Sequence, residues 1–395
     1  MTKKNLRPFA LERFFARHEF SARYLLSTSD CEGLAMADLV DGADFDLRRR
    51  WGELRLGYTE SQGFPELREE VAGLYRRATP AEVLVAAPEE AIFLFMNSLL
   101  EPGDHVICTF PGYQSLYELA VSIGCEVTFW EPSEADAWRF DPGSLADCLR
   151  PDTKLVVCNF PHNPTGALPP KRDFARMLAA AESVGAWVLS DEMYRLLESA
   201  EETRLPPAVD EYEKAVSLSG MSKAFGLAGL RIGWIVTHDL GLLEKMAALK
   251  DYTTICSSAP AELLALMALR SRERILQLHR DRLRRNVESA TEFFTRHVTR
   301  FRCAPPQGGT VCFPHLLPGG EGMAAPGVVR TDSPEQLHGE GSEAFCARIL
   351  RDTGVLLLPS IVYDYGDEHF RLGLGRDDFA EGLNVLDACL NDRCG

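Results

Sequence analysis

The chain has 395 residues, which is long enough for a second domain beside a large hydrophobic core. Hydrophobic residues make up 46% of it and charged residues 25%, an ordinary globular balance, and no apolar run approaches the roughly 20 residues of a membrane-spanning helix. The formal net charge of −16 argues against nucleic acid as a partner, because phosphate binding requires an exposed basic face.

The first two thirds of the chain alternate between strand-like and helix-like segments. Residues 5–26 are predicted to form an amphipathic helix, and Pro65 with the glutamates after it marks the acidic first turn of another helix. Short β-rich runs then recur between helix-length segments, at 83–85, 105–110, 126–130, 154–159, 187–190, 215–218 and 232–236. This alternation predicts an α/β domain with a mostly parallel sheet that ends near residue 236.

The remaining residues predict a smaller α+β domain. Residues 239–299 are rich in Leu, Arg and Glu and suit helices that connect two domains. Shorter strand signals follow at 310–314, 355–358 and 369–374, and a final helix is predicted at 377–390. A segment rich in Gly, Pro and Glu, residues 317–342, is predicted to be an exposed loop. We therefore predict a large domain over residues 45–282 and a small domain built from both termini, residues 1–44 and 283–395.

One lysine stands in an unusual setting. Lys223 lies in the stretch VSLSGMSKAFGLAGLRIGW, residues 216–234, among apolar residues and glycines. An ammonium group would lose hydration there, which lowers its pKa and makes the amine nucleophilic enough to form a Schiff base with a carbonyl. A lone lysine is more often a surface residue on a turn, so the interpretation depends on the other motifs of the chain.

Two further polar residues follow predicted strands, where open α/β sheets bind their ligands. Asn163 lies in the proline-dense turn FPHNPTG, residues 160–166, although turn statistics alone favour a capping asparagine equally well. Asp191 lies where the strand at 187–190 emerges from the sheet. A buried carboxylate at that point requires a cationic partner, and a protonated heterocycle nitrogen would be one.

Five linked motifs resemble those of the class I/II aminotransferases, the fold-type-I enzymes that use pyridoxal 5'-phosphate (PLP). They occur in that family's order and spacing, and the resemblance runs from about Tyr58 to the C-terminus: NPTG at 163–166, DEMY at 191–194, Ser-Lys at 222–223, Arg231 in GLRIG and Arg371 in FRLG. The resemblance implies PLP as the cofactor, amino acids and 2-oxo acids as substrates, and a large domain that binds the cofactor.

The resemblance assigns catalytic roles to Lys223, Asp191 and Tyr194. Lys223 would hold the cofactor as a Schiff base and then move a proton between the substrate α-carbon and the cofactor. Asp191 would pair with the pyridine nitrogen and keep it protonated, which makes the ring an electron sink. Tyr194 and Asn163 would hydrogen-bond the phenolic oxygen of the ring, and Asn163 would also face the substrate.

The resemblance also implies how the cofactor and the substrate are bound. Tyr113 would stack on the ring, although without the resemblance it is equally well a half-buried core aromatic. Arg231 and Ser222 would bind the phosphate, and Arg371 would bind the substrate α-carboxylate in a bidentate geometry that lysine cannot supply. Tyr58 would reach the phosphate of the neighbouring subunit's cofactor, so we expect a homodimer with a shared active site.

Three segments depart from the family pattern. Where a small-residue turn usually opens a helix under the phosphate, this chain reads AAPEEA, and we expect the Glu89 and Glu90 amides to point toward the cofactor and their side chains outward. The usual phosphate-binding serine three positions before the lysine is Gly220, so that contact is lost or moved to Ser219. Residues 27–33, STSDCEG, replace the usual Gly-x-Pro substrate loop.

The reaction type stays open, because one cofactor supports several reactions. Our first prediction is an aminotransferase that moves an amino group between an α-amino acid and a 2-oxo acid. The N-terminal LER helix, the Ser-rich loop, APEE and GMSK are also similar to capreomycidine-synthase-like proteins, which eliminate and cyclise a hydroxyarginine, so a PLP-dependent lyase or cyclase is the alternative. The substrate side chain is not specified, and Arg23 and Arg55 are candidates for binding a second carboxylate.

Two other classes of function are disfavoured. A regulator built on this fold carries an added DNA-binding domain, and residues 1–57 show no helix-turn-helix with a basic face. A metal site among His105, His162 and the cysteines fails on spacing, so we predict no metal. The eleven scattered cysteines and the lack of a signal-peptide pattern indicate reduced thiols and a cytoplasmic location.

Overall fold

The structure is a computed structural model, and it describes residues 6–317 and 340–392. Seven strands form one large sheet in the spatial order β1-β7-β6-β5-β4-β2-β3. They are β1 (Val83–Ala86), β2 (His105–Thr109), β3 (Glu126–Trp130), β4 (Thr153–Asn159), β5 (Trp187–Asp191), β6 (Ala215–Gly220) and β7 (Gly233–Thr237). In this sheet only β7 runs antiparallel to its neighbours, β1 and β6. The predicted mostly parallel sheet is confirmed, and each of the seven predicted runs forms a strand.

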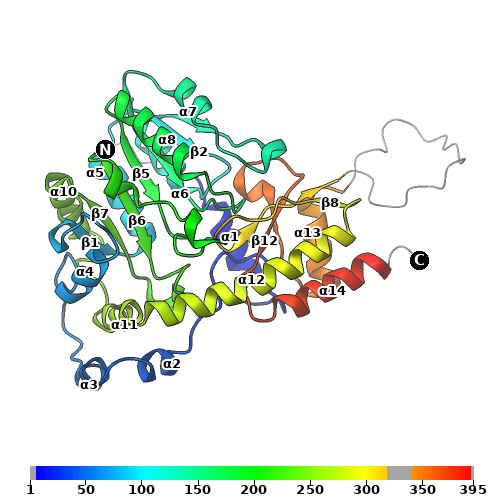
Figure 1. Ribbon diagram of the computed structural model, residues 1–395, viewed down its shortest axis with the longest axis horizontal. Helices are drawn as coiled ribbons and strands as arrows, with labels where there is room; N and C mark the ends of the chain where they lie inside the picture. Colours follow the sequence, from blue (N-terminus) through cyan, green and yellow to red (C-terminus); the bar gives the residue numbers. More distant parts are fainter. Residues whose placement is uncertain (1–5, 318–339, 393–395) are drawn as a thin grey trace, which may run out of the picture.

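Helices cover both faces of the large sheet (Figure 1). Successive side chains of a strand point to opposite faces, so Val106 and Cys108 of β2 pack in one cluster and Ile107 packs in another. Both faces are therefore apolar, as in buried parallel sheets. The covering helices are α4 (Pro65–Ala72), α5 (Pro88–Leu99), α6 (Ser115–Ile123), α7 (Pro142–Cys148), α8 (Lys171–Ser183), α9 (Ala208–Glu211), α10 (Leu240–Lys250) and α11 (Ala259–Arg270).

The C-terminal unit combines short antiparallel strands with two helices. We use this name for β8 (Phe301–Arg302), β9 (Val311–Cys312), β10 (His315–Leu316), β11 (Leu358–Pro359), β12 (Phe370–Gly373), α13 (Ser342–Thr353) and α14 (Phe379–Asp392). The strand signals at 310–314 and 369–374 and the final helix are confirmed. The signal at 355–358 overlaps β11 only at Leu358, and the predicted loop at 317–342 lies almost wholly outside the described residues.

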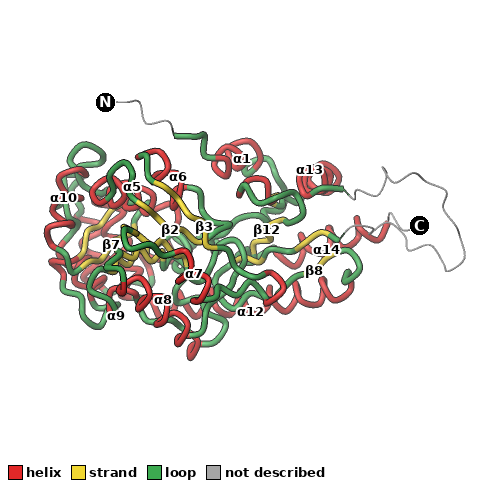
Figure 2. Tube along the Cα trace, turned by 90° about the horizontal axis from the view of Figure 1, so that it is seen from above, coloured by secondary structure: helices red, strands yellow, loops and turns green. Residues whose placement is uncertain are grey.

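The 25-residue helix α12 (Arg272–Arg296) runs from the large sheet to the C-terminal unit, which lie at opposite ends of the molecule (Figure 2). This confirms the predicted helical connection. The predicted domain boundary at residue 282 falls within α12, and the division into 45–282 and the two terminal segments stays a prediction. None of the described helices is both long and apolar enough to cross a membrane.

The N-terminal residues form three short helices, α1 (Ala10–His18), α2 (Met36–Asp41) and α3 (Phe45–Glu53). The predicted helix at 5–26 is therefore too long. After His18 the chain turns and becomes extended, because Tyr24 forms a parallel bridge with Val355 and its amide donates to the Gly354 carbonyl. Backbone pairing with the C-terminal unit thus replaces the last turns of the predicted helix.

Candidate active site

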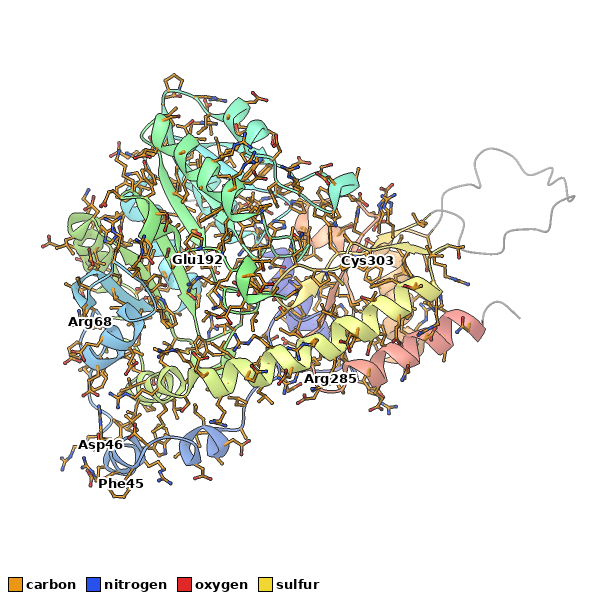
Figure 3. All side chains as sticks on the ribbon, in the orientation of Figure 1. Phe45, Asp46, Arg68, Glu192, Arg285 and Cys303 are labelled. Atoms are coloured by element: carbon orange, nitrogen blue, oxygen red, sulfur yellow. The ribbon has the colours of Figure 1, made fainter. Side chains whose placement is uncertain are left out.

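A cavity of about 500 Å³ opens where β4, β5 and β6 end. Glu192, which follows Asp191 at the end of β5, lies between the large sheet and the C-terminal unit in Figure 3. Most of the residues that the sequence predicted for the site line this one cavity: Glu89, Tyr113, Asn163, Asp191, Tyr194, Ser222, Lys223 and Arg231. Residues from separate motifs are thus brought together at the strand ends, where parallel sheets bind ligands.

Lys223 follows the end of β6 and points into the cavity. Its Nζ donates a hydrogen bond to Ser29 Oγ at 2.9 Å. Burial lowers the pKa of the Lys223 amine, as the sequence predicted, because the charged form has lost its hydration. Ser29 belongs to the 27–33 segment, for which the sequence predicted no specific contact. That segment therefore positions the amine.

Asp191 is only 5% exposed, and its Oδ1 accepts a hydrogen bond from the Met193 amide at 3.0 Å. Burial raises the pKa of this carboxyl to about 7. Asn159, the last residue of β4, supports the same region: its Nδ2 donates to the Asp191 carbonyl at 3.0 Å, and its Oδ1 accepts from the Asn163 amide at 2.8 Å. The sequence analysis missed Asn159, although a polar residue that ends a buried strand is the signal that pointed to Asp191.

Ser222 and Arg231 lie at the end of the cavity formed by the first turn of α5. The Ser222 Oγ is buried without a hydrogen-bond partner, and the Arg231 guanidinium is exposed and donates to the Ala228 carbonyl. An unsatisfied hydroxyl, a guanidinium and a helix N-terminus are the groups that bind a phosphate. The carboxylate of Asp191 at the other side would hold a protonated ring nitrogen. The residues present therefore fit PLP.

The departures at Pro88 and Gly220 are two halves of one packing arrangement. A Cβ at Gly220 would lie 2.8 Å from the Gly233 Cα and 3.2 Å from the Pro88 Cγ. The Pro88 ring fills the space that a serine at 220 would need, so the first turn of α5 packs directly on the ends of β6 and β7. Ser219 does not replace the lost contact, because its hydroxyl donates to the Glu192 carbonyl at 3.4 Å.

The expectation for the Glu89 side chain was wrong. Its carboxylate accepts from Ser115 Oγ at 3.2 Å and lines the cavity, and burial raises its pKa to about 7. Glu90 lies outside the cavity, where its carboxylate accepts hydrogen bonds from Thr253 and Thr254. Consecutive residues of a first helical turn point about 100° apart, so only one of the two side chains can face the cavity.

Arg371, on β12, is fully buried behind the cavity wall and does not line it. Its Nε and Nη2 donate to the Ser27 carbonyl at 2.9 and 2.6 Å, and its Nη1 donates to Asn163 Oδ1 at 3.1 Å and to the Tyr363 hydroxyl at 2.5 Å. The Phe15 ring of α1 lies 5.9 Å from the guanidinium carbon. Its role in binding an α-carboxylate stays a prediction, and the contact with Asn163 places both predicted substrate residues together.

The helix α1 supplies a wall of the cavity that the sequence did not predict. Leu11, Glu12, Phe15 and Glu19 all face the cavity, which matches their spacing on one side of a helix. The Tyr113 hydroxyl donates to Glu12 Oε1 at 3.4 Å. Burial raises the pKa of Glu19, and the nearby charge of Asp30 adds to the effect. Amphipathicity alone could show a buried face here but not what that face covers.

Three predicted residues lie elsewhere. Tyr58 is 89% exposed on a loop and does not line its own chain's cavity, so its contact with a neighbouring subunit stays a prediction. Arg23 and Arg55 do not line the cavity, and Arg23 lies 3.7 Å from Glu381 in the C-terminal unit. Their role in binding a second substrate carboxylate therefore stays a prediction.

A partly buried lysine, a buried acid and an anion-binding end together fit the site of a fold-type-I PLP enzyme. The family described as aminotransferase class I and II matches residues 27–378. This chain belongs to that family, and its cofactor is PLP.

Relatives of the chain catalyse more than one reaction. Capreomycidine synthase from Streptomyces vinaceus is 27% identical over 382 residues, which cover 95% of this chain and 92% of that protein. Aspartate/prephenate aminotransferase from Thermus thermophilus is 30% identical over 282 residues, which cover 67% and 73%. Among solved structures, a PLP-dependent aminotransferase from Streptococcus suis has a TM-score of 0.87 and the PLP-dependent cyclase OrfR one of 0.85, each with 28% identity over 98% of both chains.

Proposed function

We propose that this protein is a PLP-dependent lyase or cyclase that acts on an α-amino acid with a cationic side chain. The observation that carries the proposal is the acidic wall of the cavity. Glu12 of α1 and Glu19, the residue after that helix, face the cavity, and neither carboxylate is ion-paired with a lysine or arginine among the described residues. Asp30, also at the wall, is paired with Arg376 at 3.1 Å. The two unpaired acids therefore attract a cation.

The same wall disfavours the usual amino acceptors of transamination. A dicarboxylic 2-oxo acid brings a second carboxylate, which would meet Glu12 and Glu19. Two like charges 5 Å apart repel by about 3 kcal/mol at an effective dielectric constant of 20. Of the described cationic side chains, only Lys223 and Arg231 line the cavity, and both are used by the cofactor in this proposal.

Each residue of the site has its own role in the proposed reaction. PLP, when bound, withdraws electrons from the substrate α-carbon, so that the α-proton and then a group on the β-carbon can leave. The Lys223 amine accepts the α-proton, because burial lowers its pKa and Ser29 holds it at the cavity. Asp191 keeps a positive charge on the ring nitrogen. Arg371 and Asn163 bind the α-carboxylate once it displaces their mutual contact.

The names of two relatives support this choice of reaction. The match with capreomycidine synthase covers 95% of this chain, and OrfR is a cyclase with the same fold. The second candidate is an aminotransferase, as the sequence first predicted. It is supported by the family match and by the aminotransferases from Streptococcus suis and Thermus thermophilus.

Two further expectations belong to this proposal. The exposed loop that carries Tyr58 supports a homodimer in which each subunit contributes to the other's phosphate site. The cysteines of the described residues are free, which supports a reducing, cytoplasmic location.

The test compares two products from one set of reactions. Purified holoenzyme is incubated with L-arginine, L-lysine, their β-hydroxy derivatives and L-glutamate, each with and without 2-oxoglutarate, and products are identified by mass spectrometry. We expect loss of water or ammonia from a cationic substrate without an acceptor. Formation of L-glutamate from 2-oxoglutarate at a matching rate would instead assign an aminotransferase.

Single-residue variants test whether the acidic wall binds the cationic group of the substrate. Glu12→Gln and Glu19→Gln should each raise KM for the cationic substrate by about tenfold, since an unscreened ion pair in a cavity contributes one to several kcal/mol. Glu53→Gln, on the exposed side of α3, is the matched control and should leave KM unchanged. Equal KM values in all three variants would remove the basis for a cationic substrate.

A further inference from the structure

A second cluster of chemically reactive side chains lies outside the active-site cavity. Glu134, in the 3₁₀ turn Glu134–Asp136, meets His315 of β10 and His369, the residue before β12. One potential ligand atom from each of the three lies within 4.8 Å of the other two. The two histidines form an isolated antiparallel bridge, and their ring centroids are 4.4 Å apart. Since these residues are far apart in the chain, their spacing gave no metal motif in the sequence.

One of these ligand atoms is unsatisfied. His369 is 4% exposed, and its Nε2 is buried without a hydrogen-bond partner. It faces Glu134 Oε2 at 3.3 Å, while Glu134 Oε1 lies 2.8 Å from His315 Nδ1. A buried polar atom without a partner requires an explanation.

We propose that Glu134, His315 and His369 form a site for Zn²⁺ or a similar divalent transition metal ion. Two imidazoles and a carboxylate are a ligand set that zinc uses, with a water as the fourth ligand. Zinc–ligand bonds of about 2.0–2.2 Å in a tetrahedron place neighbouring ligand atoms about 3.3 Å apart. The separation of 3.3 Å between His369 Nε2 and Glu134 Oε2 matches that geometry.

The Arg302 side chain occupies part of the proposed metal site. Its Nη2 lies 2.6 Å from Glu134 Oε1 and 3.0 Å from His315 Nδ1, in direct competition with a metal ion for the same two atoms. Its side chain is 60% exposed, so it can rotate into solvent at small free-energy cost. Arg302 lies on β8 beside Cys303, which is labelled in Figure 3 at the edge of the C-terminal unit. Metal binding therefore exchanges a surface ion pair for coordination bonds.

A metal ion at this site would join two parts of the fold. Glu134 belongs to the connection between β3 and α7 of the large sheet, and both histidines belong to the C-terminal unit. Trp138, in the same connection, packs with its ring centroid 5.4 Å from that of His369. The ion would thus fix the position of this connection on the C-terminal unit.

The experiment measures Zn²⁺ binding to the holoenzyme by isothermal titration calorimetry, with the bound metal counted after dialysis. We expect one ion per chain and a rise in Tm on binding. Glu134→Gln and His315→Gln should weaken binding by tenfold or more. His238→Gln is the matched control, because His238 pairs with Glu82 at 2.7 Å outside the cluster and should leave zinc binding unchanged.

Arg302→Gln separates a metal site from a simple ion-pair cluster. Removing the competing cation should tighten zinc binding, whereas an ion-pair cluster would only lose stability. No stoichiometric uptake by the wild-type holoenzyme would overturn the proposal. So would equal uptake by Glu134→Gln, His315→Gln and the control, or an Arg302→Gln variant that binds zinc no more tightly than the wild type.

Discussion

Asp191→Asn should stabilise the protein that has lost its cofactor while weakening its binding of PLP. Burial raises the pKa of Asp191 from 3.8 to about 7, which corresponds to about 4 kcal/mol of unfavourable free energy once the carboxyl is ionised. Because the folded-state pKa is raised, the folded protein has no such penalty below about pH 4. It loses stability as the pH rises from there to about 7. Asparagine avoids the loss, since its amide is neutral at every pH and its oxygen can still accept from Met193.

Thermal unfolding of the cofactor-free protein at two pH values measures this effect. At pH 8 the variant should unfold about 5 °C above the wild type, and at pH 5, where the folded carboxyl is protonated, the gain should fall to about 1.6 kcal/mol or 2 °C. Asp173→Asn is the matched control, because Asp173 is equally buried but paired with Arg139 at 2.9 Å, so its loss should lower Tm. An Asp191→Asn variant that is no more stable than the wild type at pH 8 would refute the reasoning.

The remaining predictions concern the cofactor, the substrate and the assembly. Lys223→Ala should abolish the covalent cofactor adduct that borohydride fixes in the wild type, as read from the intact mass. Arg371→Lys loses the forked donors to the Ser27 carbonyl and Asn163, so KM for the amino acid should rise about 100-fold while the Kd for PLP stays unchanged. Tyr58→Phe should weaken PLP binding about tenfold. Mixed dimers of the Tyr58→Phe and Lys223→Ala subunits should contain one intact site each only if Tyr58 of one subunit serves the site of the other.

The large sheet could be predicted almost to the residue, because all of its strands except the edge strand β3 are largely buried. Buried parallel strands read as near-continuous apolar runs, and the residues LVVC at 155–158 of β4 are such a run. The C-terminal unit was harder, since β9 and β11 are two residues long and their pairing depends on distant partners. The end of α1 was missed for the same reason. The extended backbone at Tyr24 pairs with Val355, which lies far along the chain.

Lys223, Asp191 and Asn163, which line the cavity, could be found from motifs at strand ends, and several of their neighbours could not. Ser29 accepts a hydrogen bond from Lys223, which is 194 positions away in the sequence. No local sequence pattern predicts such a contact. Pro88 and Gly220 each looked like a defect in the sequence, yet they form one compensating contact in space. Departures that are separate in a sequence can therefore be a single change in the fold.

In the proposed function, the cofactor and the substrate side chain are bound by different parts of this chain. Strand ends and the first turn of α5 hold the groups that fit PLP, and relatives with different reactions share that arrangement. The acidic wall belongs to α1, whose start is tied to α6 by the Ala10 amide donating to Gln114 Oε1 at 2.8 Å. Beyond its end, Tyr24 ties the chain to the C-terminal unit. Because the chain is anchored on both sides of α1, Glu12 and Glu19 keep fixed positions in the cavity wall, and in this proposal they select the substrate side chain.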